Sequence, residues 1–313
     1  MTLEQAISIS FIIPAFNEED SIGETLSSIR TGEIGLPYEV IVVDHASTDN
    51  TAKIASGLGA NVVSTKGGTI AGVRNKGVIR SSGKLIVFLD ADVSLTQRWF
   101  ETFKQVFKQL SANPMMVTGS HCNAPAQGNW IEKYWFTNLT HEVRVTHLGT
   151  GHMIVSRELF DSVGGFDEAL ETGEDYSFCM QVKSAGGRII NNPDLYVIHR
   201  DYPKSIAAFI QREAWHGMGD VTSVSAVMKS KVAVASLIFI ILHLLILLSL
   251  LASVESSVYI GLSLAGLAIL LLFSSWKKFN HCSIRVILIN SAIFYLYFIG
   301  RSLSFFKALF LKS

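Results

Sequence analysis

Two long stretches without a formal charge constrain this chain more than any other feature of its sequence. Residues 232–252 and 256–276 each contain 21 residues, include no Asp, Glu, Lys or Arg, and are rich in Leu and Ile. About 20 apolar residues in a helix cross the hydrocarbon core of a bilayer, whereas a buried globular helix rarely runs so long without a charge. We therefore predict two membrane-spanning helices over these residues.

A third uncharged segment, residues 286–300, is shorter than the first two. It can cross the membrane if Arg285 and Arg301 extend towards the two surfaces. Alternatively, it can lie at the membrane surface together with the phenylalanines that follow it. We predict a third membrane helix over 286–300, and hence a membrane domain over residues 232–313.

Charge is distributed unevenly along the chain and predicts its orientation. The membrane domain has a net charge of +5, whereas the rest of the chain has −5 and no basic stripe of the kind that binds nucleic acid. Lys277, Lys278 and Arg285 follow the second stretch, and only Glu255 lies in the loop before it. Because Lys and Arg accumulate in cytoplasmic loops, we predict that residues 1–225 form a cytosolic domain on a multi-pass membrane protein.

Strand and helix patterns alternate through the first part of the chain. The predicted strands cover residues 7–13, 39–43, 61–64 and 84–89, and the predicted helices cover residues 20–30, 51–58 and 70–80. This alternation predicts an α/β domain with a parallel, Rossmann-like sheet, whose ligands bind at the carboxyl ends of the strands. No Gly-x-Gly-x-x-Gly follows the first strand and no Walker loop is present, which disfavours a dinucleotide or P-loop fold.

The run Lys84–Leu89 ends in two aspartates, Asp90 and Asp92. Side chains two residues apart in an extended segment point the same way, so both carboxylates can converge on one hard cation. The alternative is that they are turn residues that close the strand.

The same edge of the sheet has groups suited to a nucleotide. Asp44 can accept hydrogen bonds from a base or ribose, and Lys66 and Arg74 can meet phosphates. Gly67-Gly68 precedes a helix, where backbone N–H groups can approach an anion. Taken singly, Asp44 is better explained as a turn residue and Arg74 as part of a solvated helix face.

The order of several short segments resembles family 2 glycosyltransferases of the GT-A type over residues 7 to about 220. The segments are SFIIPAFNEE (10–19), VIVVDHASTDNT (40–51), AGVRNKG (71–77), FLDADV (88–93), VGGFDE (163–168) and GEDYSF (173–178). The membrane tail resembles that of bacterial members acting on lipid-linked or envelope acceptors. A bacterial inner-membrane location is therefore expected.

The resemblance assigns roles to matching positions, to which Lys66 is added from its charge. The expected nucleotide-sugar-binding residues are Pro14, Phe16, Asn17, Glu18, Asp44, Ser47, Lys66, Arg74 and Asp90. The expected ligands of a divalent cation, Mn²⁺ or Mg²⁺, are Asp90, Asp92 and His199. Glu174-Asp175 matches the catalytic pair, with Asp175 as the base. The expected acceptor-side residues are Gly165, Phe166, Asp167 and Glu168.

These roles predict an inverting, metal-dependent glycosyltransferase that moves one sugar from a nucleotide-sugar donor to a lipid-linked or saccharide acceptor. The Gln-x-x-Arg-Trp signature of processive polymerases is absent, which favours transfer of a single sugar. Asp175 has a second interpretation as a helix N-cap. Two other functions stay open: a polyprenyl-phosphate sugar synthase, whose ionised acceptor needs little or no base, and a non-catalytic membrane scaffold that binds nucleotide sugar.

Overall fold

The computed structural model describes residues 7–125, 127–138, 145–251 and 256–310. Two compact units divide the chain. The sheet unit consists of residues 1–125 and 141–201, and the helical unit consists of residues 126–140 and 202–313.

A seven-stranded sheet with the order β3-β2-β1-β4-β7-β6-β8 forms the centre of the sheet unit. Its strands are β1 (Ile9–Ala15), β2 (Tyr38–Asp44), β3 (Asn61–Ser64), β4 (Leu85–Leu89), β6 (Met116–Gly119), β7 (His152–Ser156) and β8 (Arg188–Asn191). β3, β2, β1 and β4 run parallel to one another, so the carboxyl ends of these four strands meet at one edge. The four predicted strands and the three predicted helices between them are confirmed, with ends within two residues of the prediction.

Beyond the four predicted strands the sheet is mixed, because β7 runs antiparallel to both β4 and β6. The reason lies in the path of the chain. The chain leaves the sheet after Gly119, at the carboxyl end of β6, and returns at His152, which pairs with Leu89 at the carboxyl end of β4. A strand that enters the sheet from the edge where the previous strand left it must run in the opposite direction.

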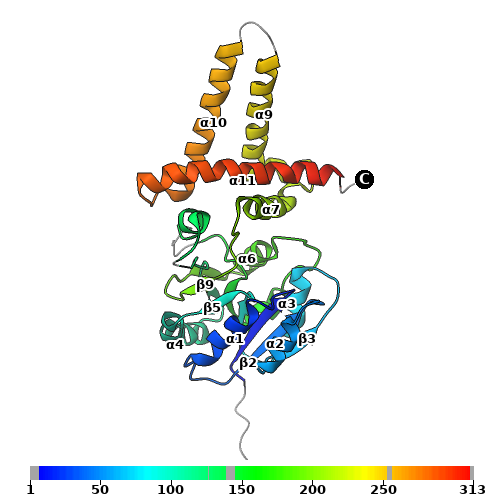
Figure 1. Ribbon diagram of the computed structural model, residues 1–313. Coiled ribbons are helices and arrows are strands. Elements are labelled where there is room, and N and C mark those ends of the chain that lie inside the picture. Colours follow the sequence, from blue (N-terminus) through cyan, green and yellow to red (C-terminus); the bar gives the residue numbers. More distant parts are fainter. Residues whose placement is uncertain (1–6, 126, 139–144, 252–255, 311–313) are drawn as a thin grey trace, which may run out of the picture. The chain divides into compact units, whose positions relative to one another are not determined.

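Among the described residues, six helices belong to the sheet unit, and Figure 1 labels most of them. They are α1 (Ile22–Thr31), α2 (Thr51–Gly57), α3 (Ile70–Ile79), α4 (Gln97–Ala112), α5 (Arg157–Ser162) and α6 (Glu174–Ser184). Helix α3 packs on β1 and β2 through Gly77. A Cβ at Gly77 would lie 2.4 Å from Ile12 Cγ2, so the glycine allows α3 to approach the sheet and carry Arg74 to its edge.

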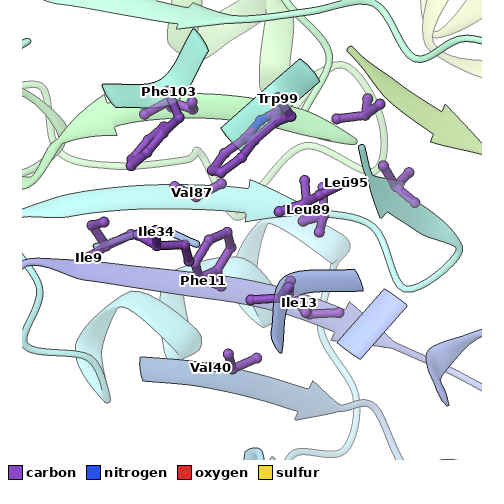
Figure 2. Close-up of a cluster of buried hydrophobic side chains, with 14 of the residues drawn as sticks. Ile9, Phe11, Ile13, Ile34, Val40, Val87, Leu89, Leu95, Trp99 and Phe103 are labelled. Carbon is purple, nitrogen blue, oxygen red and sulfur yellow. The ribbon is translucent and has the colours of Figure 1, made fainter. Parts of the chain in front are cut away.

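Two hydrophobic clusters lie on opposite faces of the sheet, as the period of two along a strand requires. Ile9, Phe11 and Ile13 of β1 point into the first cluster, whereas Ile12 points into the second. Figure 2 shows the first cluster, in which the β1 side chains gather with Val87, Leu89 and the aromatic residues of α4. There the rings of Trp99 and Phe103 stack with centroids 4.5 Å apart. Burial on both faces fixes the strand ends that carry the polar groups.

A small second sheet places His199. β5 (Val93–Leu95) follows the two aspartates directly and pairs antiparallel with β9 (Val197–His199). In this register Val93 is opposite His199. His199, the last residue of β9, therefore lies next to the segment that begins at Asp90.

The helical unit consists of a π-helical turn η1 (Glu132–Phe136), α7 (Ile206–His216), a 3₁₀ turn η2 (Met218–Val221), α8 (Val224–Lys229), α9 (Lys231–Leu251), α10 (Ser256–Phe279) and α11 (Ile284–Phe310). Helices α9, α10 and α11 each contain a segment long and apolar enough to cross a membrane: Lys231–Leu251, Ser257–Phe279 and Ile284–Ala308. The three predicted hydrophobic segments are therefore all helical. Glu255, in the loop predicted to lie outside the cell, is not among the described residues.

Candidate active site

Asp90 and Asp92 lie in a tight turn at the carboxyl end of β4. The backbone N–H of Val93 donates to the carbonyl of Asp90 at 3.1 Å, and Thr25 Oγ1 donates to the carbonyl of Ala91 at 2.7 Å. The segment is therefore a turn and not the extended strand end assumed from the sequence. The turn is fixed by its own hydrogen bond and by α1.

Asp90, Asp92 and His199 form a candidate cation site. Their ligand atoms all lie within 4.8 Å of one another, and Asp92 Oδ2 is 3.4 Å from His199 Nδ1. Burial, and then the charge of Asp90, raise the pKa of Asp92 to about 7. Two carboxylates and one imidazole form a donor set that fits a divalent cation such as Mn²⁺ or Mg²⁺, whose charge would favour the ionised form of Asp92.

A cavity of about 400 Å³ opens next to these three residues. Its lining includes seven predicted site residues: Pro14, Phe16, Glu18, Arg74, Asp90, Asp92 and His199. A larger cavity of about 700 Å³ lies around Lys84 and Arg157, at the opposite edge of the sheet, and its lining contains no predicted site residue. The smaller cavity is therefore the better candidate for a ligand site.

The loops after β1 and β2 are tied to each other by side-chain hydrogen bonds. The backbone N–H of Asn17 donates to Ser47 Oγ at 3.0 Å, and that of Thr48 donates to Asn17 Oδ1 at 2.8 Å. Asn17 has a φ of 55°, in the left-handed region that Asn tolerates better than most residues. Asn17 and Ser47 thus hold the rim in shape, whereas the Phe16 side chain is exposed beside the cavity.

Asp44 and Lys66, both predicted to contact the nucleotide, differ in their surroundings. Asp44 is buried at the end of β2, and its Oδ1 has no hydrogen-bond partner among the described residues. A buried polar atom without a partner is costly, so this oxygen is well suited to accept a hydrogen bond from a ligand. Lys66 lies exposed on the loop after β3 and does not line the cavity.

Arg74 is buried between two carboxylates. Its Nη2 lies 2.8 Å from Asp90 Oδ1 and its Nη1 lies 2.9 Å from Glu174 Oε1. The sequence analysis assigned Arg74 to phosphates, and that role stays a prediction. In the structure its guanidinium joins the aspartate of the candidate cation site to the first residue of α6.

Glu174 and Asp175 begin α6 and face different surroundings. Glu174 is buried, and Thr150 Oγ1 donates to its Oε1 at 3.3 Å in addition to the Arg74 contact. Burial raises the pKa of Glu174 despite the opposing charge of Arg74. Asp175 is partly exposed and accepts a hydrogen bond at 2.7 Å from the backbone N–H of Tyr176. Asp175 therefore remains open to solvent on a helix that Glu174 anchors.

The sequence analysis did not identify the segment Gly149-Thr150-Gly151, which links the two sides of the site. A Cβ at Gly151 would lie 2.9 Å from Asp90 Oδ2, and one at Gly149 would lie 3.7 Å from Asp175 Oδ2. The two glycines therefore permit the backbone to pass close to both carboxylates. Two glycines flanking one residue were the signal in the sequence, but nothing there indicated which carboxylates they approach.

The predicted acceptor-side loop is attached to α3. Asn75 Nδ2 donates to the carbonyl of Phe166 at 2.8 Å and to Glu168 Oε1 at 2.9 Å. Phe166 is buried in the second hydrophobic cluster, with its ring centroid 5.0 Å from that of Phe88. Gly165 adopts a φ of 71°, and Asp167 and Glu168 are exposed. Of the four predicted residues, only Asp167 and Glu168 present side chains to solvent.

Comparison with known proteins identifies the family of this domain. Residues 10–163 match the family model described as Glycosyl transferase family 2. This part of the chain is a family 2 glycosyltransferase domain, and the protein is a glycosyltransferase.

Two relatives and one solved structure illustrate the relationship. Over 209 residues the chain is 28% identical to glycosyltransferase AglE of Haloferax volcanii, a match that covers 62% of this chain and 67% of that protein. A shorter match to 4,4'-diaponeurosporenoate glycosyltransferase of Staphylococcus aureus is 37% identical over 97 residues and covers 29% of this chain and 25% of that protein. Mannosyltransferase PcManGT from Pyrobaculum calidifontis, solved with GDP-Man and Mn²⁺, has a TM-score of 0.56 at 17% identity, covering 98% of this chain and 90% of that chain. The predicted GT-A fold class is confirmed.

Proposed function

We propose that the protein is an inverting, cation-dependent glycosyltransferase that transfers one sugar from a nucleotide-sugar donor to a membrane-associated acceptor. The observation that carries this proposal is the gathering of Asp90, Asp92 and His199 beside a cavity of about 400 Å³ at the carboxyl edge of the sheet. This is the edge at which open α/β sheets bind their ligands. The structure of PcManGT with GDP-Man and Mn²⁺ has the same fold.

Donor binding is assigned to residues that line the cavity and to Asp44, which does not line it. The unpartnered Oδ1 of Asp44 would accept a hydrogen bond from the base or ribose, and Phe16 would cover the nucleotide at the rim. Asp90, Asp92 and His199 would hold Mn²⁺ or Mg²⁺. When bound, such a cation neutralises the charge that develops on the departing diphosphate. Arg74 fixes one oxygen of Asp90, which leaves the other oxygen available to a ligand.

The chemical step is assigned to Asp175. Its carboxylate would take the proton of the acceptor hydroxyl as the acceptor oxygen forms a bond to the anomeric carbon. The bond from that carbon to the diphosphate breaks, and the diphosphate leaves with the bonding electrons. With one base and no second nucleophile assigned to the site, direct displacement inverts the anomeric configuration.

The membrane unit suggests where the acceptor lies. Three candidate membrane helices follow the glycosyltransferase domain, and the excess of Lys and Arg after α10 favours a cytosolic position for residues 1–225. Residues 232–313 would then anchor the enzyme in the membrane. An acceptor that is itself held in or at the membrane, lipid-linked or part of an envelope polysaccharide, would be delivered to such an enzyme.

The substitution Asp175→Asn tests the proposed base and separates it from the alternative enzyme. If the acceptor is a hydroxyl, single-turnover transfer from the nucleotide sugar should fall by roughly 10²–10⁴, the usual contribution of a positioned base. Donor affinity should stay unchanged, because Asp175 does not line the donor cavity. Glu171→Gln, an exposed position before α6, is the matched control.

A near wild-type rate in Asp175→Asn would exclude Asp175 as the base. That result would favour a polyprenyl-phosphate sugar synthase, whose acceptor phosphate is already ionised at neutral pH. Donor binding without transfer or hydrolysis of any nucleotide sugar, in wild type as well as variant, would instead support a non-catalytic scaffold.

A further inference from the structure

Helix α11 does not run along the hairpin formed by α9 and α10. Its first turns meet the last turns of α10, where Ser275 Oγ donates to the carbonyl of Ile287 at 2.6 Å. Its last turns meet the first turns of α9, where Arg301 and Phe305 enclose a small space together with Ser236. Between Ile287 and Phe305 the helix rises about 27 Å. Its contacts with α9 extend from that end to the middle of the helix, where His243 Nε2 lies 3.1 Å from the Tyr295 hydroxyl.

Figure 1 shows the same arrangement within the helical unit: α11 runs crosswise to α9 and α10. The aromatic contacts agree with it, since the Phe298 ring stacks on Phe239 of α9 with centroids 5.6 Å apart. Towards the loop that joins α9 and α10, Leu248, Leu251, Val258 and Leu262 are exposed. A helix that crossed the membrane beside the hairpin would cover some of these side chains.

The other side of α11 packs against charged, water-compatible segments. α11 is in contact with α7, η1 and η2. Arg301 Nη2 lies 3.2 Å from Glu213 of α7, and its Nη1 lies 3.3 Å from Asp220 of η2. Asn290 Nδ2 donates to the carbonyl of Tyr134 at 2.8 Å. Placing α11 across the bilayer would carry α7 and its charges into the hydrocarbon core, at a cost of several kcal/mol for each charge.

Exposed basic residues surround this end of the hairpin. They are Lys229, Lys231, Lys277, Arg285 and Lys307, whereas the ammonium of Lys278 packs over the Trp135 ring at 4.9 Å from its centroid. Among the described residues of the helical unit, the acidic side chains of Glu132, Glu213 and Asp220 are buried or half-buried. The exposed surface at this boundary is therefore strongly positive. Such a surface attracts anionic lipid headgroups, by about 1 kcal/mol for each Lys or Arg near the membrane.

We propose that α9 and α10 alone cross the membrane and that α11 lies along the surface of one leaflet, with anionic lipid headgroups as its partner. Exposed apolar side chains of α11, among them Leu288, Leu303 and Phe306, would enter the boundary between headgroups and acyl chains. The length and composition of α11 permit a span, but its contacts place it across the end of the hairpin. This inference concerns membrane topology and is independent of the proposed transfer reaction.

The two arrangements place the two ends of α11 differently. If α11 lies on the surface, Ser283 before it and Lys307 near its end are on the same side of the membrane. If it crosses, they are on opposite sides. Cysteines introduced as Ser257→Cys, Ser283→Cys and Lys307→Cys, one at a time, can be labelled with an impermeant maleimide. The full-length background would carry Cys122→Ser, Cys179→Ala and Cys282→Ser, with wild-type folding verified first.

We expect Ser283→Cys and Lys307→Cys to label alike in intact and permeabilised cells, and Ser257→Cys to show the opposite pattern. A Lys307→Cys variant that follows Ser257→Cys would overturn the proposal, as would labelling of all three from one side. A second measurement applies if Lys307→Cys does not react. Bimane attached at Leu288→Cys or at Leu303→Cys should be quenched by brominated lipids in the same pattern, which would place both positions at the same depth in the membrane. A spanning α11 would instead separate the two positions by about 22 Å.

Discussion

Two arginines of this protein, one in each unit, share the same local chemistry and differ in what surrounds them. Arg74 lies between Asp90 and Glu174, and Arg301 lies between Glu213 and Asp220. Around Arg301 the packing is closed, because the adjoining space is too small for a water molecule. Around Arg74 a cavity of about 400 Å³ opens, with Asp92 and His199 on its wall.

The difference indicates what each ion pair does. A closed pair can only hold elements together, so Arg301 connects α11 to α7 and η2. The open pair holds the carboxylate of Asp90 in place beside a cavity in which a ligand can bind. The exposure of the side chains does not separate the two pairs, since Asp90 is 32% and Asp220 is 31% exposed; the cavity beside Arg74 does. The same motif is therefore structural in the helical unit and is a candidate positioning element in the glycosyltransferase domain.

The largest expected effect is on the closed pair. Arg301→Leu leaves the buried Glu213 with Arg212 alone, whose Nη1 lies 2.7 Å from Glu213 Oε1, so the loss should approach but not exceed the cost of breaking a buried pair, about 3–5 kcal/mol. Thermal unfolding of the full-length protein in detergent should show this loss, while the affinity for nucleotide in the remaining folded protein stays unchanged. Adding Glu213→Leu should restore most of the stability, because an apolar pair can replace a buried ion pair. A double variant as unstable as Arg301→Leu alone would contradict the purely structural role.

The open pair should respond differently to the same treatment. Arg74→Lys keeps the charge but cannot bridge two carboxylates with a planar fork, so Asp90 and α6 lose their common support. A displacement of about 1 Å in a reacting group lowers turnover by about 10²-fold. We expect a loss of this size in kcat. Arg74→Leu with Glu174→Leu should fold yet remain inactive, and recovery of transfer in that double variant would reduce Arg74 to a structural residue.

A smaller effect, on pH dependence, should come from a histidine behind Asp90. His152 is fully buried, accepts a hydrogen bond at its Nε2 from Trp99 Nε1–H at 2.8 Å, and contacts Ser120 Oγ through Nδ1 at 2.9 Å. Burial lowers the pKa of His152 from 6.5 to about 3. Below the ordinary pKa the unfolded chain binds a proton that the folded chain does not, so stability is complete above pH 6.5 and decreases as pH falls towards 3.

This histidine should contribute a slope of about 1.4 kcal/mol per pH unit to the free energy of unfolding in that window. His152→Gln, which keeps an acceptor for Trp99, should unfold with a shallower dependence on pH between neutrality and about pH 5. Denaturant unfolding of both proteins across that range measures the difference. Equal slopes would mean that His152 is protonated in the folded protein or is exposed to solvent.

The alternation of strands and helices was predictable because burial leaves a strong pattern in the sequence. Residues 7–89 carry that pattern, and their strands and helices were predicted to within two residues. The direction of β7 was not predictable, because it depends on where the segment between Gly119 and His152 leaves and re-enters the sheet. The sequence has no signal for these two points. Hydrophobic length indicated three membrane helices but not the crossing of α11, which depends on partners such as Glu213 and Tyr134 far along the chain.

The residues of the candidate site were largely predictable from the sequence, but the contacts between them were less so. The aspartates and His199 were assigned to one cation from their spacing and from the family resemblance, and their ligand atoms do gather within 4.8 Å. The bridging position of Arg74 was missed, since it pairs with Glu174 across 100 residues of sequence. The role of Gly149 and Gly151 was missed for the same reason. Long-range pairing between charged groups leaves no periodic pattern.

We propose that Asp90, Asp92 and His199 bind a divalent cation that in turn binds the donor diphosphate. Isothermal titration of UDP and of GDP, each with and without Mn²⁺, tests it in wild type, in Asp92→Asn and in the exposed control Asp161→Asn. We predict that Mn²⁺ raises the affinity for one of these nucleotides at least about tenfold, or about 1.4 kcal/mol, in wild type and control. This gain should disappear in Asp92→Asn, although the variant stays folded. A Mn²⁺-dependent gain of the same size in Asp92→Asn, or its absence in wild type, would contradict the account.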